Sequence, residues 1–219
     1  MFRHPDYGII IATNVSIFNP FGPGSNKGGQ IVAMRIKGLN EQLIQQYITE
    51  ALLILMEKKP YEKISIGEIC ERAGVNRSSY YRHFGVKDDI VYFYLMSLME
   101  EYQLAYEQQK HKTFRSYTLQ IFTTFYAHRD QLLLIHRNGL SHILLDVFNE
   151  CFRFGEIPDE VGSRKQFEVS YHIGGIYNDT LLWLNHDMKE TPEQMTEITL
   201  SFRPEGSFTL LNVRDSADG

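Results

Sequence analysis

The stretch ISIGEICERAGVNRSSYYRHFGVKDD, Ile64 to Asp89, decides the fold. Ser65 followed three residues later by Glu68 is typical of a capping box, in which the serine oxygen accepts from a first-turn amide and the glutamate reaches back to the cap amide. Apolar residues then recur at helical spacing: Ile66, Ile69, Cys70 and Ala73. The pattern predicts a short helix that begins just after Ser65.

A tight turn and a second helix are expected next. Gly74 suits the turn because glycine adopts positive φ without a Cβ clash. Val75 is expected to plug the space between the helices, and Asn76 is a good N-cap for a helix from about Arg77 to Phe84. Helix, glycine turn and helix form the helix-turn-helix pattern, whose second helix enters the DNA major groove by its N-terminal residues.

The side chains on this second helix suit contact with a duplex. Arg77 can donate two hydrogen bonds to a guanine edge, while Ser78 and Ser79 are small and can bond a base or a phosphate. The expected phosphate contacts, which set affinity and register, are Tyr81, His83 and Lys87. An ordinary helical hairpin with a solvated basic face is the alternative that the pattern alone leaves open.

The residue string narrows that choice. Residues 73–89, AGVNRSSYYRHFGVKDD, resemble the recognition segment of the TetR family of bacterial transcriptional regulators, typically A-G-V-x-x-x-x-[FLY]-Y-x-[HY]-F-x-x-K-[DE]. The matching residues are Ala73, Gly74, Val75, Tyr80, Tyr81, His83, Phe84, Lys87 and Asp88. The resemblance covers roughly residues 40–102.

This resemblance implies a role for each site residue. Arg77, Ser78 and Ser79 fall at positions that read bases in the family. The positions that hold phosphates are occupied by Ser65, Tyr81, His83 and Lys87. Tyr80 falls where the family buries Phe or Leu, so we expect it in the core with its hydroxyl near the surface.

Charge is divided unevenly along the chain. The whole chain carries a net charge of −5. Residues 34–87 hold nine Lys or Arg and six Asp or Glu, hence +3, whereas residues 88–219 hold eleven and twenty, hence −9. A modestly basic head on an acidic body confines the field that attracts phosphate to one end. Because this excess of positive charge is small, tight binding would need two heads on one duplex. We therefore expect a homodimer.

Composition limits the other classes of function. Cys70 and Cys151 lie in apolar contexts that predict buried side chains rather than disulfides. No basic segment precedes an apolar run, and no stretch approaches 18 apolar residues, so we expect a cytoplasmic protein that does not enter a membrane. There is no G-x-S-x-G, no phosphate-binding glycine loop and no CxxC pair. We therefore expect no enzyme, no cofactor and no metal site.

The first 33 residues differ from the rest. They are rich in Gly, Pro and Asn and lack helical periodicity. Met34 opens a segment typical of the start of a TetR-like protein, so we expect residues 1–33 to be disordered or to reflect a start site assigned too early. A DNA-touching arm is the alternative.

The remaining pattern predicts an all-α protein with a three-helix head, residues 34–87, and a helical body, residues 88–200. Helical periodicity runs from Glu41 to Pro60, and a long helix is expected to start at Asp88 or Asp89. Further helices are expected at Thr113–His128, Arg129–His136, Ser141–Phe154, Ser163–Met188 and Pro192–Leu200. The tail, residues 201–219, has no assigned role.

The body is expected to bind an effector and to form the dimer. Its aromatic residues and one histidine suggest an effector pocket lined by Phe114, Tyr117, Tyr126, His136, Phe148, Phe152 and Tyr171; plain core packing is the alternative. Residues 171–195 resemble a TetR branch that includes regulators of dihydroxyacetone kinase operons. The resemblance suggests a dimer face at Gly174, Gly175, Ile176, Leu181 and Trp183, with intramolecular core as the alternative.

These expectations combine into one hypothesis. The chain is predicted to be a homodimeric regulator, a repressor rather than an activator, that binds a palindromic operator in double-stranded DNA. An unknown small-molecule effector acting on the body would control it. The alternative is a co-regulator or activator controlled by a partner protein. The sequence specifies neither the operator nor the effector.

Overall fold

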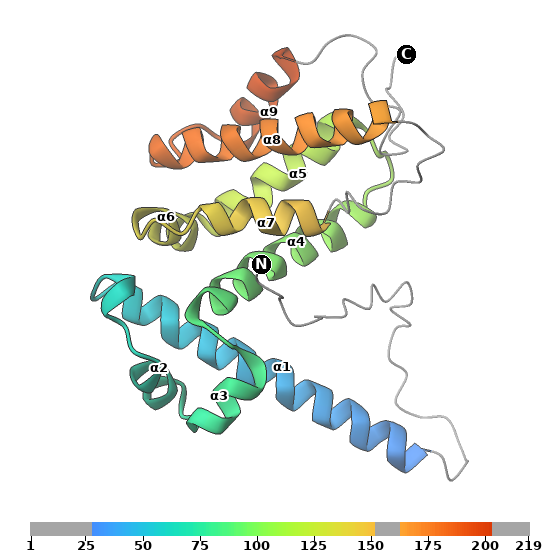
Figure 1. Ribbon diagram of the computed structural model, residues 1–219. Coiled ribbons are helices and arrows are strands. Elements are labelled where there is room, and N and C mark those ends of the chain that lie inside the picture. The colour runs from blue at the N-terminus through green and yellow to red at the C-terminus, as the bar shows by residue number, and fades with distance from the viewer. Residues whose placement is uncertain (1–27, 152–162, 203–219) are drawn as a thin grey trace. The chain divides into compact units, whose positions relative to one another are not determined.

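The computed structural model of the protein describes residues 28–151 and 163–202, and within these ranges every regular element is a helix (Figure 1). The helices are α1 (Gly28–Met56), the 3-10 helix η1 (Tyr61–Lys63), α2 (Ile66–Ala73), α3 (Arg77–His83), α4 (Lys87–Glu107), α5 (Phe114–Ala127), α6 (Arg129–Arg137), α7 (His142–Cys151), α8 (Ser163–Asn185) and α9 (Pro192–Ser201). The predicted all-α class is confirmed.

The chain divides into two units, Met1–Asn40 and Glu41–Gly219, and the first helix spans the boundary. Helix α1 begins at Gly28, so it includes residues 28–33 of the segment that was expected to be disordered or to reflect a start site assigned too early. Once a helix has nucleated, each added residue gains a hydrogen bond at little cost, and no proline interrupts this segment. Residues 1–27 lie outside the described part of the chain.

Local capping defines α2 and α3 as the sequence predicted. The Ser65 side chain accepts from the Glu68 amide, and both halves of the capping box are present. Gly74 ends α2 at φ 67°, in the left-handed region that favours glycine. Asn76 caps α3 by accepting from the amide of Ser79 at 2.7 Å. The two helices therefore meet through a turn whose geometry is fixed by three short-range contacts.

A buried core lies under this helix-turn-helix. It consists of Ile48, Leu52, Ile69, Tyr80, Phe84 and Ile90, each no more than 1% exposed. Val75 is half-buried and packs against the core, as expected of a plug. Because α1 and α4 supply three of the six core residues, the head depends on helices on both sides of it in the sequence.

Helices α4 to α9 pack through a second set of contacts. Helix α5 contacts α4 and α9, α7 contacts α4 and α8, and α6 contacts α5 and α8. The helices begin and end close to their predicted bounds, except that α8 ends at Asn185 rather than Met188. Asp187 and Met188 instead have φ of 55° and 49°. The Met188 amide donates to the Trp183 carbonyl at 2.8 Å, which closes this left-handed turn.

Helix α6 is bonded to segments on both of its sides. At its C-terminal cap, Asn138 Oδ1 accepts from the Tyr61 amide of η1 at 3.0 Å. Arg129 donates to the Asp187 carbonyl at 3.1 and 2.6 Å, and Arg137 pairs with the Asp187 carboxylate at 2.8 Å. One short helix therefore touches both the head and the α8–α9 turn.

Across the two described ranges, none of the helices combines the length and the apolar character that crossing a membrane requires.

Candidate DNA-binding interface

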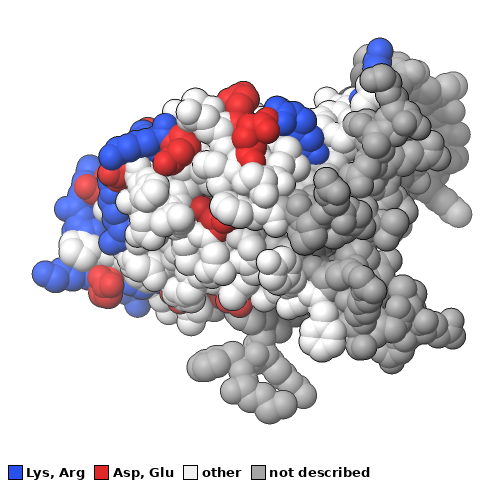
Figure 2. All heavy atoms as spheres, turned by 90° about the horizontal axis from the view of Figure 1, so that it is seen from above, with Lys and Arg blue, Asp and Glu red and all other residues white. Residues whose placement is uncertain are grey.

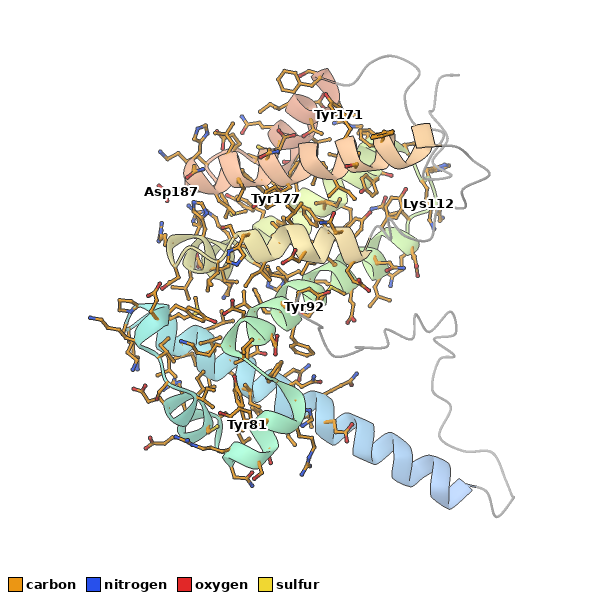
Figure 3. The ribbon with its side chains drawn as sticks, in the orientation of Figure 1. Tyr81, Tyr92, Lys112, Tyr171, Tyr177 and Asp187 are labelled. Carbon is orange, nitrogen blue, oxygen red and sulfur yellow. The ribbon has the colours of Figure 1, made fainter. Side chains whose placement is uncertain are left out.

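Helix α3 presents two different faces. Tyr80 and the capping Phe84 are buried at 0% and 1% exposure, whereas Tyr81 between them is 55% exposed (Figure 3). Arg77 and Ser78 at the start of the helix are also exposed, and Ser79 is half-buried. The predicted base-reading residues therefore stand at the solvent side of the N-terminal turn, with Tyr81 one turn further along.

Tyr80 departs from the prediction in one respect. Its hydroxyl, expected near the surface, is buried and has no hydrogen-bond partner among the described residues. The ring packs edge-on against Tyr81, with centroids 5.2 Å apart, and lies 6.1 Å from the Phe84 ring. Burial raises the pKa of Tyr80, so the hydroxyl stays neutral. The aromatic ring fills the core at the cost of an unsatisfied oxygen.

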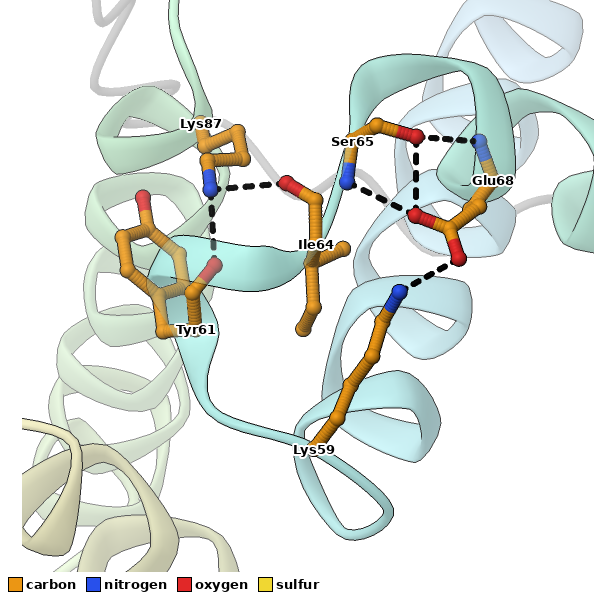
Figure 4. A network of polar contacts seen from close by, with 6 residues as sticks. All are labelled: Lys59, Tyr61, Ile64, Ser65, Glu68 and Lys87. Atoms are coloured by element: carbon orange, nitrogen blue, oxygen red, sulfur yellow. Dashed lines mark hydrogen bonds and ion pairs between the residues drawn. The ribbon is translucent and has the colours of Figure 1, made fainter.

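Ser65 takes part in a small polar network at the start of α2 (Figure 4). Its hydroxyl donates to Glu68 Oε2 at 2.8 Å and its amide donates to the same oxygen at 3.0 Å. Lys59 pairs with the other Glu68 oxygen, and Lys59 with Ser65 lowers the pKa of Glu68 to about 2. Since Ser65 has one hydroxyl hydrogen, a phosphate would have to compete with Glu68 for it.

Lys87, predicted to contact phosphate, is held inside the head. Its ammonium donates to the carbonyls of Tyr61 at 2.7 Å and Ile64 at 2.8 Å, and lies 4.2 Å from the Tyr61 ring centroid (Figure 4). Burial lowers its pKa. The Tyr61 hydroxyl also donates to Asp88, and this hydrogen bond joins η1 to the first turn of α4. This arrangement leaves one ammonium hydrogen for another partner.

His83 closes α3 and is half-buried. Burial lowers the pKa of its imidazole, despite the opposing influence of Glu41. A neutral imidazole can donate one hydrogen bond to a phosphate but adds no charge. His83 is therefore placed as a weaker phosphate contact than a charged side chain would be.

The predicted effector residues do not surround one hollow. Phe114, Tyr117 and Phe148 are buried, whereas Tyr126 is 40% exposed. Tyr171, which is labelled in Figure 3, is 80% exposed. His136 bonds Ser141 at 2.8 Å and Asn185 at 3.2 Å. Phe152 lies outside the described residues. Tyr171 is therefore not part of an interior pocket, because its side chain is exposed. Tyr126 is partly exposed, and its ring stacks on the buried Trp183 with centroids 5.9 Å apart rather than lining a cavity.

Aromatic stacking accounts for most of the buried members of this set. The Phe148 ring stacks on Phe125 with centroids 6.0 Å apart, and Phe114 stacks on Tyr117 at 5.8 Å. The Tyr117 hydroxyl lies 3.3 Å from His172 Nε2. These contacts fit the alternative of plain core packing.

Two hollows occur elsewhere on the described surface. One, of about 1090 Å³, is lined by α1, α4 and the segment His128–Arg137 that contains α6. The other, of about 620 Å³, lies between α1 and α2. None of the predicted effector residues lines either hollow.

The predicted dimer residues fall on opposite faces of α8. Ile176 and Trp183, each 1% exposed, face the core, and Trp183 packs edge-on against Phe122 at 5.4 Å. These two residues are therefore not available to a partner, and that part of the prediction is wrong. Gly175 is exposed, Gly174 and Leu181 are half-buried, and a Cβ at either glycine would meet nothing within 4 Å.

The exposed face of α8 carries three large apolar side chains, together with the polar Asn178. Phe167, Tyr171 and Leu182 are 72%, 80% and 57% exposed, and their spacing places them on the same side as Gly175. On α9, Ile198 and Phe202 are also exposed. Figure 2 views the molecule from the α8–α9 end, where the described surface is largely uncharged and charged side chains gather toward its margin. The periodicity of the apolar residues could have identified this face from the sequence.

The described ranges show no candidate metal site. They contain no group of three or more His, Cys, Asp or Glu that could hold a metal ion. Cys70 is buried and Cys151 is half-buried, and both are free thiols.

Comparison with known proteins identifies the head. Residues 48–92 match the family model of the bacterial regulatory proteins of the tetR family. Among solved structures, a TetR transcriptional regulator from Streptococcus agalactiae 2603V is 20% identical, with 77% of this chain and 97% of that chain covered and a TM-score of 0.44. Among the curated proteins, none is similar enough to match. The matched residues include all of α2 and α3, so this part of the chain is similar to the corresponding segment of the tetR family of bacterial regulatory proteins.

Proposed function

We propose that the protein represses transcription by binding a palindromic operator as a homodimer in the cytoplasm. The head would comprise residues 34–87 and the effector-binding and dimerisation body residues 88–200. The observation that carries the proposal is the exposed N-terminal turn of α3, where Arg77 and Ser78 face solvent beside the exposed ring of Tyr81. In a helix-turn-helix this is the part that enters the major groove.

The contacts divide into those that select sequence and those that set affinity. Arg77 would donate to a guanine edge, and Ser78 and Ser79 would approach neighbouring bases. Tyr81 would donate its exposed hydroxyl to a phosphate. Ser65, His83 and Lys87 would contribute less than an unengaged side chain, because each is partly committed or half-buried within the head.

Dimerisation would use the exposed apolar face of α8 and α9. Burying Phe167, Tyr171, Leu182, Ile198 and Phe202 against a second copy would remove large apolar side chains from water. The small side of this face, at Gly175, would let the partner backbone approach closely. Two heads held at a fixed spacing would read two half-sites.

Control of the protein is proposed to act through α6. This helix is bonded to the head through Asn138 and to the α8–α9 turn through Arg129 and Arg137. A small effector that moves α6 would therefore disturb both the head and the dimer helices. The alternative, a partner protein bound to the body, would act on the same contacts. Either way, the coupling between effector and operator must be reciprocal.

The test is a salt-titrated binding assay. Duplexes flanking the coding region, and duplexes selected from a randomised pool, are titrated with wild type and with Tyr81→Ala. Specific binding that the substitution weakens at every sequence supports the proposal. The matched control is Tyr47→Ala, which removes a similarly exposed tyrosine from α1. Failure of the dimeric wild type to bind any duplex, even at low salt, would overturn the proposal.

A further inference from the structure

Gly67, in the first turn of α2, faces a side chain from the next helix. A Cβ built on this glycine would lie 3.1 Å from Nη2 of Arg77, closer than ordinary van der Waals contact. The guanidinium therefore extends back from the start of α3 across the first turn of α2. Its charge also acts on Cys70, whose thiol pKa is raised by burial and partly lowered by Arg77.

The conformation of Gly67 does not itself require glycine. Gly67 lies inside a helix and its φ is not in the left-handed region, unlike the φ of Gly74. Glycine within a helix is less stable than alanine by about 1 kcal/mol. The missing side chain therefore makes α2 by itself less stable. It also leaves a space, and the Arg77 guanidinium lies beside this space.

Arg77 is not fixed in that space by an attraction. Within the described ranges its guanidinium forms no hydrogen bond and no ion pair, and the side chain is exposed. Its donors therefore remain available to a base edge or a phosphate. What Gly67 provides is room, which sets the direction in which the guanidinium extends without using any of its donors.

We propose that Gly67 is a positioning residue for DNA recognition: by leaving the first turn of α2 uncovered, it lets Arg77 lie across that turn and meet the duplex from there. The inference rests on the proposed function of the head. It adds a residue of α2 to those that determine which base pair is preferred, although Gly67 itself has no side chain to contact DNA.

The test is a graded series in two backgrounds. Gly67→Ala and Gly67→Leu are made in wild type and in Arg77→Ala, and each variant is titrated with duplexes that wild type selects from a randomised pool. In wild type, affinity and base preference should fall from Gly to Ala to Leu. The Leu variant should approach the loss caused by Arg77→Ala, about 5–150-fold for a good bidentate base contact. In the Arg77→Ala background, the series should be flat.

Thermal unfolding separates this role from a structural one. Gly67→Ala should raise the melting temperature by about 2–4 °C, because alanine favours the helix, while binding weakens. Unchanged affinity and base preference in Gly67→Leu, or an equal loss in the Arg77→Ala background, would overturn the inference and leave the proposed function standing. A wild type that selects no duplex would overturn both.

Discussion

Two basic side chains of the head, Arg77 and Lys87, lie in contrasting surroundings. Arg77 is exposed and has no bonded partner in the described ranges, whereas Lys87 donates to two backbone carbonyls and lies over the Tyr61 ring. The same contrast recurs on α8, where Leu182 is exposed beside the buried Trp183. In both places, two residues of similar chemistry differ in role: one holds the fold and the other is exposed to a partner.

The largest expected effect concerns α8. Trp183→Ala should lower the free energy of unfolding by about 3–5 kcal/mol, because it empties a site that is 1% exposed and removes a hydrogen bond to Glu190. Urea unfolding measures this loss. Leu182→Ala is the matched control: it should leave the unfolding of the monomer nearly unchanged and raise the dissociation constant of the dimer in sedimentation equilibrium. Equal effects of the two variants on monomer stability would show that Leu182 and Trp183 do not differ in this way.

Lys87 provides the next test. Lys87→Met should lower the free energy of unfolding by about 1–3 kcal/mol, because it removes a donor from the Tyr61 carbonyl, which keeps its bond from the Ile64 amide, and leaves the Ile64 carbonyl without its ammonium partner. Lys63→Met, at an exposed position of η1, is the control for loss of one charge. At temperatures where the head is folded, the salt slope of DNA binding should change little. A slope reduced by about one contact, with stability intact, would instead support the original assignment of Lys87 to a phosphate.

Arg77 should behave in the opposite way. Arg77→Ala should reduce discrimination at one base pair by about 1–3 kcal/mol if it forms a good bidentate base contact. Its unfolding free energy should stay within about 0.5 kcal/mol of wild type, as for a surface change. Competition between single-base variants of the selected duplex measures the first quantity, and urea unfolding the second. Uniform weakening on every duplex would identify Arg77 as a phosphate contact.

The smallest effect is a pH dependence at the start of α2. The pKa of Glu68 is lowered from about 4.5 to about 2 by Lys59 and Ser65. A depressed carboxyl pKa stabilises the fold above the unfolded value and loses that contribution as the pH falls toward the folded value. The stability difference between wild type and Glu68→Gln should therefore narrow between about pH 5 and pH 2. A difference that stays constant over this range would exclude the ionised Glu68 as its source.

The local contacts of the head could be predicted from the sequence, whereas its long-range contacts could not. The caps at Ser65 and Asn76 and the turn at Gly74 depend on residues at most four positions apart, so their pattern is visible in the chain. The environment of Lys87 depends on carbonyls 26 and 23 positions away. Sequence motifs identify such a lysine but not the backbone groups that it meets.

The body shows the same limit. The aromatic residues of the described body lie in helices, as the sequence predicts, but Tyr171 faces solvent and Phe148 stacks on Phe125. Whether each aromatic side chain faces the core or the solvent depends on which helices pack against α8 and α5. Those contacts join distant parts of the chain. The position of Arg77 over Gly67 was missed for a related reason, since a glycine offers no side chain to suggest a contact.

Disulfide cross-linking tests whether the exposed N-terminal turn of α3 meets base pairs. Ser78→Cys is mixed with a selected duplex that carries a thiol-tethered base, and Asp146→Cys, at an exposed position of α7, is the control. The wild-type protein, which contains Cys70 and Cys151, gives the background yield of cross-linking. We expect rapid cross-linking at position 78, confined to one or two base positions in each half-site. Equal yields at positions 78 and 146, or no dependence on the base that carries the thiol, would show that this turn does not meet base pairs.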